Sequence, residues 1–521
     1  MENNNKYEHI SPEKFEFAQK DAYIFDEKLK TKSRGFFADA MLRFKKNKSS
    51  VVAAYIIGFL VLFAIVSPII SPYDIKDKDN VYVNYPPYVE SFAEAGAGIL
   101  DGSYALNSQS EIQLASLKAI GVETGRNPII KILGTTETTE IYRGKERVKT
   151  TYKVEVNRYY MEGLRTMVFS YEEFDAIQKY QLETGRQVVY PIVEKKDIYP
   201  NASKSTLDSI ADNPNTWYVC ADTKGTPKYD ADGNFIPAYT TNKAKEGVEY
   251  YSQRIPGDDG SYIYSLAKSG SVQCRVDYYN YYAFKNGNVP MFIFGTDTLG
   301  HDLFCAIGVG ARFSLIFAVF VSAINLSIGA VIGAIQGYYG GALDLFTERI
   351  IEVLSGVPFI VVATLFQLHL AQKVGVVPSF LFAFVLTGWI GMAALTRKQF
   401  YRFKSQEFVM AARTLGASDK RLMFKHIFPN SLGTIITSCA LVIPGVINSE
   451  TSLTYLGIVN LSSMVGTTIG DLMSQGQAAM TTSPHAMLFP SLFMSLLLIS
   501  FNLFGNGLRD AFNPSTRGTE D

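Results

Sequence analysis

The stretch that decides the fold is EFVMAARTLGASDKRLMFKHIFPN, at residues 407–430. Its first half carries apolar side chains at positions i, i+3, i+4 and i+7, the spacing of one helical face. These residues are Phe408, Ala411, Ala412 and Leu415. Gly416 is expected to end that helix, because glycine adopts the left-handed conformation without a steric penalty. The pattern predicts an elbow of two short amphipathic helices over residues 405–430.

The ends of the two helices carry their own signals. Ser405 and Ser418 precede the first and the second helix, and serine is a preferred N-cap residue. Pro429 is predicted to end the second helix. Small residues at the bend would let the surface of another protein approach the backbone closely. These residues are Ala411, Ala412 and Gly416.

Six apolar segments surround the elbow. A helix needs about 20 apolar residues to cross a hydrocarbon layer about 30 Å thick. Residues 51–70 (VVAAYIIGFLVLFAIVSPII) meet this need without a charge, and they lie too far from the N-terminus for an ordinary cleaved signal peptide. The others lie at about 313–336, 350–371, 376–396, 433–456 and 486–504. The sequence therefore predicts an all-α polytopic membrane protein with about six transmembrane helices.

Basic residues next to the apolar segments predict the orientation. Four Lys or Arg residues stand between positions 43 and 48, and eight stand between positions 397 and 425. Both clusters are cytoplasmic if six helices follow a cytoplasmic N-terminus. The expected parts are a cytoplasmic leader (1–50), a first span (51–70), an extracellular inserted domain (71–294), a five-helix core (295–506) and a cytoplasmic tail (507–521).

The elbow resembles the EAA signature of importer-type ABC permeases, whose core is Glu-Ala-Ala, three residues and Gly, followed later by Ile-x-x-Pro or Ile-x-Pro. The form typical of the peptide permeases runs on to Gly-Ala-Ser and His-Ile-Leu-Pro-Asn, and Phe428 stands here where Leu is usual. The matching residues are Glu407, Phe408, Val409, Ala411, Ala412, Gly416, Ala417, Ser418, His426, Ile427, Pro429 and Asn430.

Two further motifs extend the resemblance to the dipeptide and oligopeptide permeases. GTDTLGHD at residues 295–302 is similar to a family element in which Arg stands at the position of His301. Residues 502–510, NLFGNGLRD, resemble the closing family motif, with Asn506 in place of a common Asp. The shorter, C-type partner of the oligopeptide systems is the closer match. The resemblance covers the first span and the chain after Gly295.

This resemblance implies a permease subunit that carries oligopeptides or dipeptides across a bacterial plasma membrane. Its implied partners are a second homologous permease subunit in a heterodimer, two cytoplasmic ATPase subunits, an extracellular substrate-binding protein, the peptide and membrane lipid. The elbow would couple ATP hydrolysis to transport through Glu407, Ala411, Ala412, Gly416, Ile427 and Pro429.

The chain is expected to lack catalytic activity and to bind no cofactor. Gly295-x-x-x-x-Gly300 lacks the Lys of a phosphate loop, so ATP and Mg would be bound by the partner subunits. The histidines have no metal-ligand spacing, and a net charge of zero gives no indication of nucleic-acid binding. Nickel chelates or another small solute remain alternative substrates. A membrane-anchored receptor is the alternative from another class, although no cytoplasmic output domain is evident.

The inserted domain is predicted to be α+β. Ser170-x-x-Glu173 has the spacing of a capping box, and Gly185 marks the helix end. Strands are expected at residues 150–156 and 272–282, and Asp232-Gly233-Asn234 predicts a turn. Most of its many tyrosines are expected to fill the domain's own core.

Four other residues are candidates for special roles. Glu450 is an ionisable group within a predicted span, close to Asn448, and such groups usually face a bundle interior or a watery cavity. It could line the pathway or lock against a partner helix, and we favour the lock. Cys220 and Cys274 both belong to the inserted domain, where they could form a disulfide or remain two unrelated buried thiols.

Overall fold

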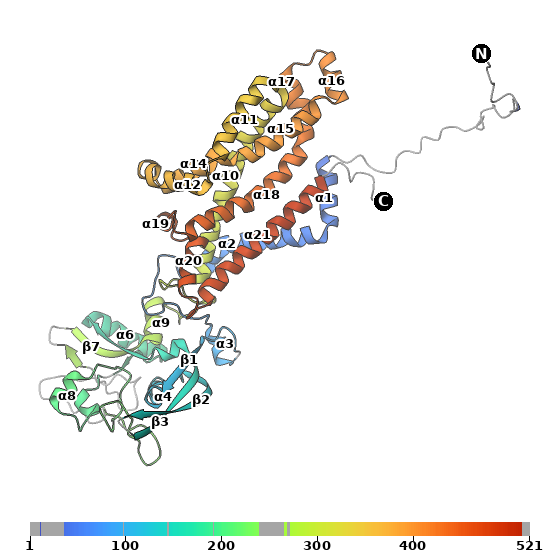
Figure 1. The fold of residues 1–521 in the computed structure, drawn as a ribbon. Helices are drawn as coiled ribbons and strands as arrows, with labels where there is room; N and C mark the ends of the chain where they lie inside the picture. The colour runs from blue at the N-terminus through green and yellow to red at the C-terminus, as the bar shows by residue number, and fades with distance from the viewer. Residues whose placement is uncertain are drawn as a thin grey trace.

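The computed structural model describes residue 11 and residues 36–96, 98–142, 145–190, 192–238, 265–267 and 271–512. A long helical part occupies one end of the molecule and a smaller part with two sheets occupies the other (Figure 1). Most of the predicted leader and residues 513–521 of the predicted tail lie outside the described residues. α1 (Phe36–Lys46) is the first described helix.

Within the described residues, five helices are long and apolar enough to cross a membrane. Three are single helices: α2 (Lys48–Ile70), α10 (Leu303–Tyr339) and α21 (His485–Phe512). The fourth is the run Val376–Lys404, made of α14 (Val376–Gly388) and α15 (Ile390–Lys404). The fifth is the run Asp419–Tyr455, which ends in α18 (Phe428–Tyr455). Two short helices lie between α18 and α21, namely α19 (Ser462–Val465) and α20 (Ile469–Ala478). Five predicted spans thus have a helical counterpart.

The predicted span at 350–371 is wrong as one continuous helix. α11 (Gly341–Ser355) is followed by a second run, Phe359–Val374, bent by 76° from it. That run comprises α12 (Phe359–Leu365), the π-helix η3 (Phe366–Leu370) and α13 (Ala371–Val374). Pro358 causes the break, because its ring disfavours a helical conformation at the preceding residue and it has no N–H. The described residues therefore contain five candidate spans, or six if the bent pair is one span.

α10 and α15 touch through their backbones. A Cβ on Gly333 would lie 2.2 Å from the carbonyl oxygen of Ala393, and one on Gly329 would lie 2.7 Å from that of Trp389. Gly337 continues the same face one turn later, against Phe400 and Arg397. Glycines spaced four residues apart allow two helices to approach closely. This close packing matters in a membrane, because lipid provides no hydrophobic driving force for helix association.

The inserted domain lies between α2 and α10 and contains strands and helices. One antiparallel sheet has the strand order β1-β3-β2, and the other has the order β4-β7-β5 with β6 also pairing with β7. The strands are β1 (Ser103–Ser110), β2 (Ile129–Tyr142), β3 (Lys145–Asn157), β4 (Leu164–Phe169), β5 (Val189–Tyr190), β6 (Ser265–Ala267) and β7 (Ser271–Asp277). The helices are α3 (Glu90–Glu94), α4 (Glu111–Thr124), α5 (Arg158–Met161), α6 (Tyr171–Thr184), α7 (Lys195–Ile198), α8 (Lys204–Ser209) and α9 (Tyr278–Asn286).

The helix ends, strands and turn predicted for this domain are confirmed, with one exception. The Ser170 capping box and the left-handed Gly185 bound α6, and the strand predicted at 150–156 is part of β3. The turn at Gly233 is present, with φ +81. The strand predicted at 272–282 is wrong beyond residue 277, because the carboxylate of Asp277 accepts the N–H of Tyr279 and starts α9.

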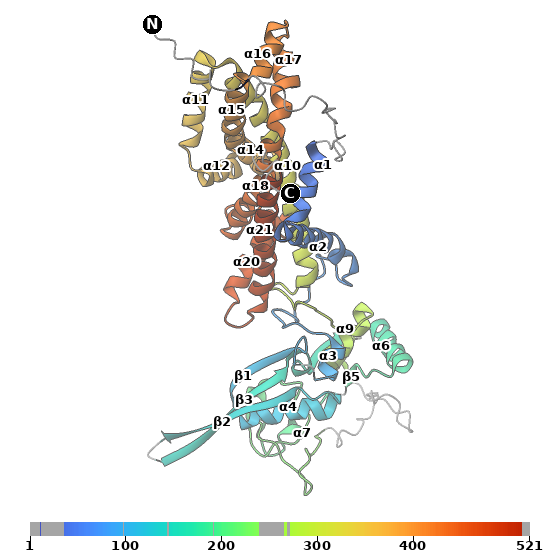
Figure 2. The ribbon, with the colours of Figure 1, turned by 90° about the vertical axis from the view of Figure 1, so that its right-hand side faces the viewer.

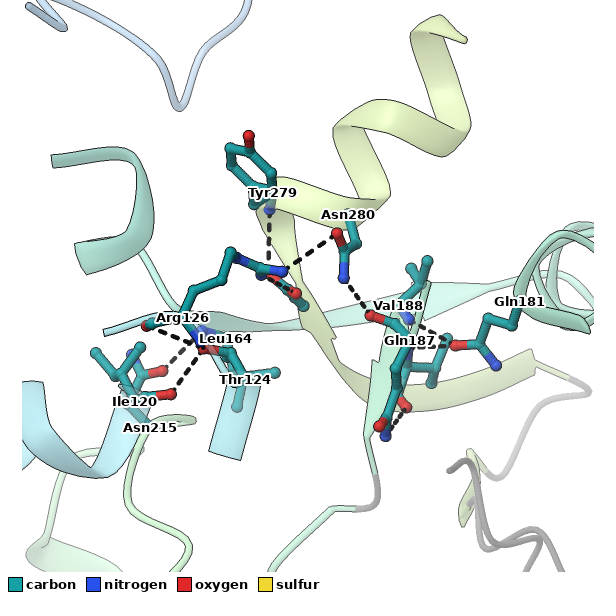
Figure 3. Close-up of polar contacts among 12 residues, drawn as sticks. Ile120, Thr124, Arg126, Leu164, Gln181, Gln187, Val188, Asn215, Tyr279 and Asn280 are labelled. Atoms are coloured by element: carbon teal, nitrogen blue, oxygen red, sulfur yellow. Dashed lines mark hydrogen bonds and ion pairs between the residues drawn. The ribbon is translucent and has the colours of Figure 1, made fainter. Parts of the chain in front are cut away.

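Tyrosine rings fill the core next to the membrane helices. The prediction that tyrosines fill the domain's own core is confirmed for Tyr82, Tyr85, Tyr88, Tyr159, Tyr278, Tyr279 and Tyr282. Buried polar side chains connect this core to the second sheet (Figure 3). Arg126 pairs with Asp277 and donates to Asn280, which donates to the Gln187 carbonyl at 2.7 Å. The core is therefore packed and cross-linked by hydrogen bonds.

Of the two alternatives for Cys220 and Cys274, the structure has the two unrelated buried thiols and not the disulfide, since both thiols are free and buried. Cys274 lies with Val272 and Val276 in the core of the second sheet, whereas Cys220 packs with Trp217 and Tyr218 in another cluster. Burial raises the pKa of each thiol to about 12, which keeps both protonated.

Candidate functional site

The predicted elbow forms the end of the helical part that lies farthest from the inserted domain (Figures 1 and 2). α16 (Glu407–Thr414) is its first helix. Gly416 follows with φ +82, and the chain continues into α17 (Asp419–Arg421) and the π-helix η4 (Leu422–Ile427). Two helices joined at a left-handed glycine are therefore present, as predicted.

Buried apolar side chains fix the elbow to the spans. Val409, Leu422 and Ile427 are fully buried. They pack in one cluster with Tyr338 of α10 and Phe400 of α15. A displacement of the elbow would therefore be transmitted directly to both helices, because close-packed side chains resist compression.

A polar bridge adds to this contact. The hydroxyl of Tyr338 donates to Oδ1 of Asp419 at 2.5 Å, and Arg413 donates to the same hydroxyl at 3.3 Å. Lys404 donates to the Tyr338 carbonyl at 3.3 Å. Sequence reasoning missed this bridge, because no spacing rule connects a tyrosine at the end of one span to an aspartate 81 residues later.

The predicted apolar stripe of α16 faces outward. Leu415 is 88% exposed and Phe408 is 42% exposed, while Phe424 of η4 is 61% exposed. Glu407 and Ala411 are exposed as well, and Ala412 is half-buried. The elbow thus offers an apolar surface with small residues, which is typical of a protein-binding site.

The predicted caps and the role of Pro429 need correction. Gln406, not Ser405, is the N-cap of α16, and Ser418 is the N-cap of α17 without a side-chain hydrogen bond. Pro429 lies in the first turn of α18, so the helix continues through it into the span. The wider turn of η4 directly precedes it, and such a turn accommodates the missing N–H of proline.

Glu450 lies on α18 with no exposed surface. One carboxylate oxygen accepts the hydroxyl of Ser314 on α10 at 2.7 Å and that of Thr451 at 3.3 Å. Its other oxygen has no partner among the described residues. Asn448 is exposed instead, so the structure does not bring these two candidates together. The Ser314 contact joins two spans, which is the geometry expected of a structural lock.

The motif at residues 295–302 joins the inserted domain to the spans. Asp297 accepts hydrogen bonds from the N–H groups of Leu299 and His301, both at 2.8 Å, and His301 Nδ1 lies 2.9 Å from its other oxygen. A Cβ on Gly300 would lie 2.0 Å from the Asp79 carbonyl oxygen. His301 therefore takes part in a local pairing although the family residue there is Arg.

Comparisons with known proteins agree with this geometry. Residues 329–518 match the family model described as "Binding-protein-dependent transport system inner membrane component". Residues 35–87 match the model described as "N-terminal TM domain of oligopeptide transport permease C". The elbow and α18 lie within the first match, and α2 lies within the second.

Curated proteins give the same result. The oligopeptide transport system permease protein OppC of Bacillus subtilis is 38% identical over 224 residues, which are 43% of this chain and 72% of that protein. The dipeptide transport system permease protein DppC of Bacillus subtilis is 36% identical over 43% of this chain and 69% of that protein. A match to a solved structure of the MetNI methionine ABC transporter spans 40% of this chain and 96% of the transporter chain, at 13% identity and a TM-score of 0.33. With its elbow, its spans and these matches, the chain belongs to the family of permease subunits of binding-protein-dependent ABC importers, in the group of the oligopeptide and dipeptide C-type permeases.

Proposed function

We propose that this chain forms one half of the pathway of an ATP-driven peptide importer in a bacterial plasma membrane, paired with a second homologous permease subunit. The observation that carries the proposal is the elbow, which exposes Leu415 and Phe408 while burying Val409 and Leu422 against the spans. The relatives are oligopeptide and dipeptide transport permease proteins by name, which supports peptides as the substrate.

The elbow is the docking site for a cytoplasmic ATPase subunit. Exposed apolar side chains next to small residues let a partner surface cover them without a clash. Closure of two ATPase subunits around ATP and Mg would move both elbows of the heterodimer. This motion shifts the spans between outward-facing and inward-facing states only if the elbow makes different contacts in the two states.

The inserted domain lies outside the cell under this proposal, and both described chain ends lie inside. It stands at the end of the molecule opposite the elbow (Figure 2), where an extracellular substrate-binding protein would deliver its peptide. Glu450, held by Ser314, acts as a lock between α10 and α18 and does not line the pathway.

Reconstituted uptake of a labelled peptide tests the elbow. A Cβ at Gly416 would meet nothing within 4 Å, so its φ of +82, and not space, restricts substitution. Gly416→Val combined with Glu407→Lys is therefore expected to abolish uptake while the chain still inserts. Gly416→Asn is the matched control, because asparagine tolerates this conformation and should retain more uptake than valine. Normal uptake by the double variant would refute the proposed coupling.

A further inference from the structure

A groove of about 590 Å³ lies beside β3 of the first sheet of the inserted domain. The first turns of α4 form one wall, β3 forms the second, and the loop at residues 222–229 forms the third. Its apolar and hydroxyl surface includes Ile112, Ala115, Val148, Thr150, Thr226 and Tyr229. This volume falls in the range of about 300–1,000 Å³ in which proteins bind small ligands.

One wall of the groove is a free strand edge. β1 pairs with β3 only as far as Ser110, which lies opposite Thr151, and the chain then turns into α4. β2 stays paired with β3 as far as Lys145. Among the described residues, 145–150 therefore have a strand partner on one side only, and Figure 2 shows β2 and β3 continuing past the end of β1 as a two-stranded ribbon. Such an edge accepts an added strand through its backbone N–H and C=O groups.

The charges of the groove favour carboxylates on a ligand. Three lysines line it, namely Lys118 of α4, Lys149 of β3 and Lys224 of the loop, against two carboxylates, Glu111 of α4 and Asp222 of the loop. In the part of the chain that the structure describes, neither Lys118 nor Lys149 takes part in an ion pair within 4.0 Å. The carboxylate of Asp222 already accepts the N–H groups of Lys224 and Thr226, both at 3.0 Å, and the Thr226 hydroxyl at 2.8 Å.

We infer that this groove binds a short acidic peptide in an extended conformation, added to the free edge of β3 as a continuation of β1. Backbone pairing would supply affinity that depends little on sequence, while the lysines would select acidic side chains or a terminal carboxylate. The choice of a free peptide as the occupant rests on the proposed function, because an importer of peptides meets them at this domain.

Binding to the purified full chain in lipid nanodiscs, without any other subunit, tests the inference. The probe is a fluorescent pentapeptide of alternating Glu and Val, measured by anisotropy. The same peptide with N-methylated alternate amides, which cannot pair with a strand, should bind at least about tenfold more weakly, and so should a peptide with Lys in place of Glu. Absence of binding by the wild-type chain, or equal binding of the methylated peptide, would overturn the inference.

Variants locate the site. Lys118→Glu with Lys149→Glu should weaken binding about tenfold or more, because like charges then face the probe. Lys153→Glu is the matched control, since Lys153 is exposed on the same strand but does not line the groove. An equal loss in the control would contradict the assignment. The assignment would also be contradicted if free peptides bound neither the wild-type chain nor the double variant, while a substrate-binding protein lost affinity for the double variant.

The result is separable from the proposed function. Peptide uptake by the assembled transporter without peptide binding in the groove would remove this inference and leave the importer intact. Peptide binding in the groove without peptide uptake by the assembled transporter would refute the importer function and leave the groove as a peptide-binding site.

Discussion

Between α10 and α15, glycines at 329, 333 and 337 bring the two helix backbones close together, whereas the inserted domain has a core of tyrosine rings and buried ion pairs. Lipid gives helices no hydrophobic drive to associate, so close backbone approach and dispersion hold the spans. In the inserted domain, water provides the hydrophobic driving force for folding. Its large tyrosine rings bury apolar surface, and their hydroxyls form hydrogen bonds. The comparison teaches that each part is adapted to its own solvent.

The largest expected effect concerns the buried charges of the inserted domain. Arg275 and Glu123 pair at 2.5 Å with side chains only 3% and 4% exposed. Arg275→Met removes the guanidinium that pairs with the buried carboxylate of Glu123, and the inserted domain should lose about 3–5 kcal/mol of stability. Hydrogen exchange of the strands in the purified chain measures this loss. Arg275→Met with Glu123→Leu should recover most of it, and a double variant as unstable as the single one would contradict the explanation.

The corresponding test of the helical part fills a glycine contact. Gly333→Leu places a side chain where the Ala393 carbonyl oxygen lies 2.2 Å from the Cβ position, so the chain should lose about 3 kcal/mol. The thermal unfolding midpoint in detergent is the readout. Gly391→Leu on α15 is the control, because nothing lies within 4 Å of its Cβ position. Equal midpoints for the two variants would show that backbone contact does not hold these helices together.

The length of the apolar segments allowed five of the six spans to be predicted, and cap and turn residues allowed α6 and β3 to be predicted. The bend at Pro358 was missed, since segment length outweighed a single proline. α9 was missed because the tyrosines at 278–282 fit a strand as well as a helix, and only the position of Asp277 starts the helix.

The candidate site was predicted in position but not in orientation. Spacing identified the apolar stripe of α16, yet only the packing of Val409 and Leu422 decides that Leu415 faces outward. Contacts between residues distant in the sequence, such as Ser314 with Glu450, left no local pattern. The groove at the edge of β3 likewise depends on where β1 stops pairing.

A smaller effect is expected where the elbow meets the spans. Tyr338→Phe removes the hydroxyl that donates to Asp419, at a cost of about 1 kcal/mol. Amide exchange of α16 and α17 should become faster while exchange in the inserted domain stays unchanged. Tyr339→Phe serves as the control, because Tyr339 is 56% exposed. Unchanged exchange in the elbow of Tyr338→Phe would show that the bridge does not hold it.

The central claim is that the elbow binds the ATPase subunits, and their affinity for the chain in nanodiscs tests it most directly. Leu415→Glu changes a side chain that is 88% exposed, so it should leave the fold intact and weaken ATPase binding by about tenfold or more. Leu133→Glu, at a 43% exposed position of the inserted domain, should leave the Kd unchanged. A Leu415→Glu chain that binds the ATPase subunits as tightly as the wild type would contradict the account.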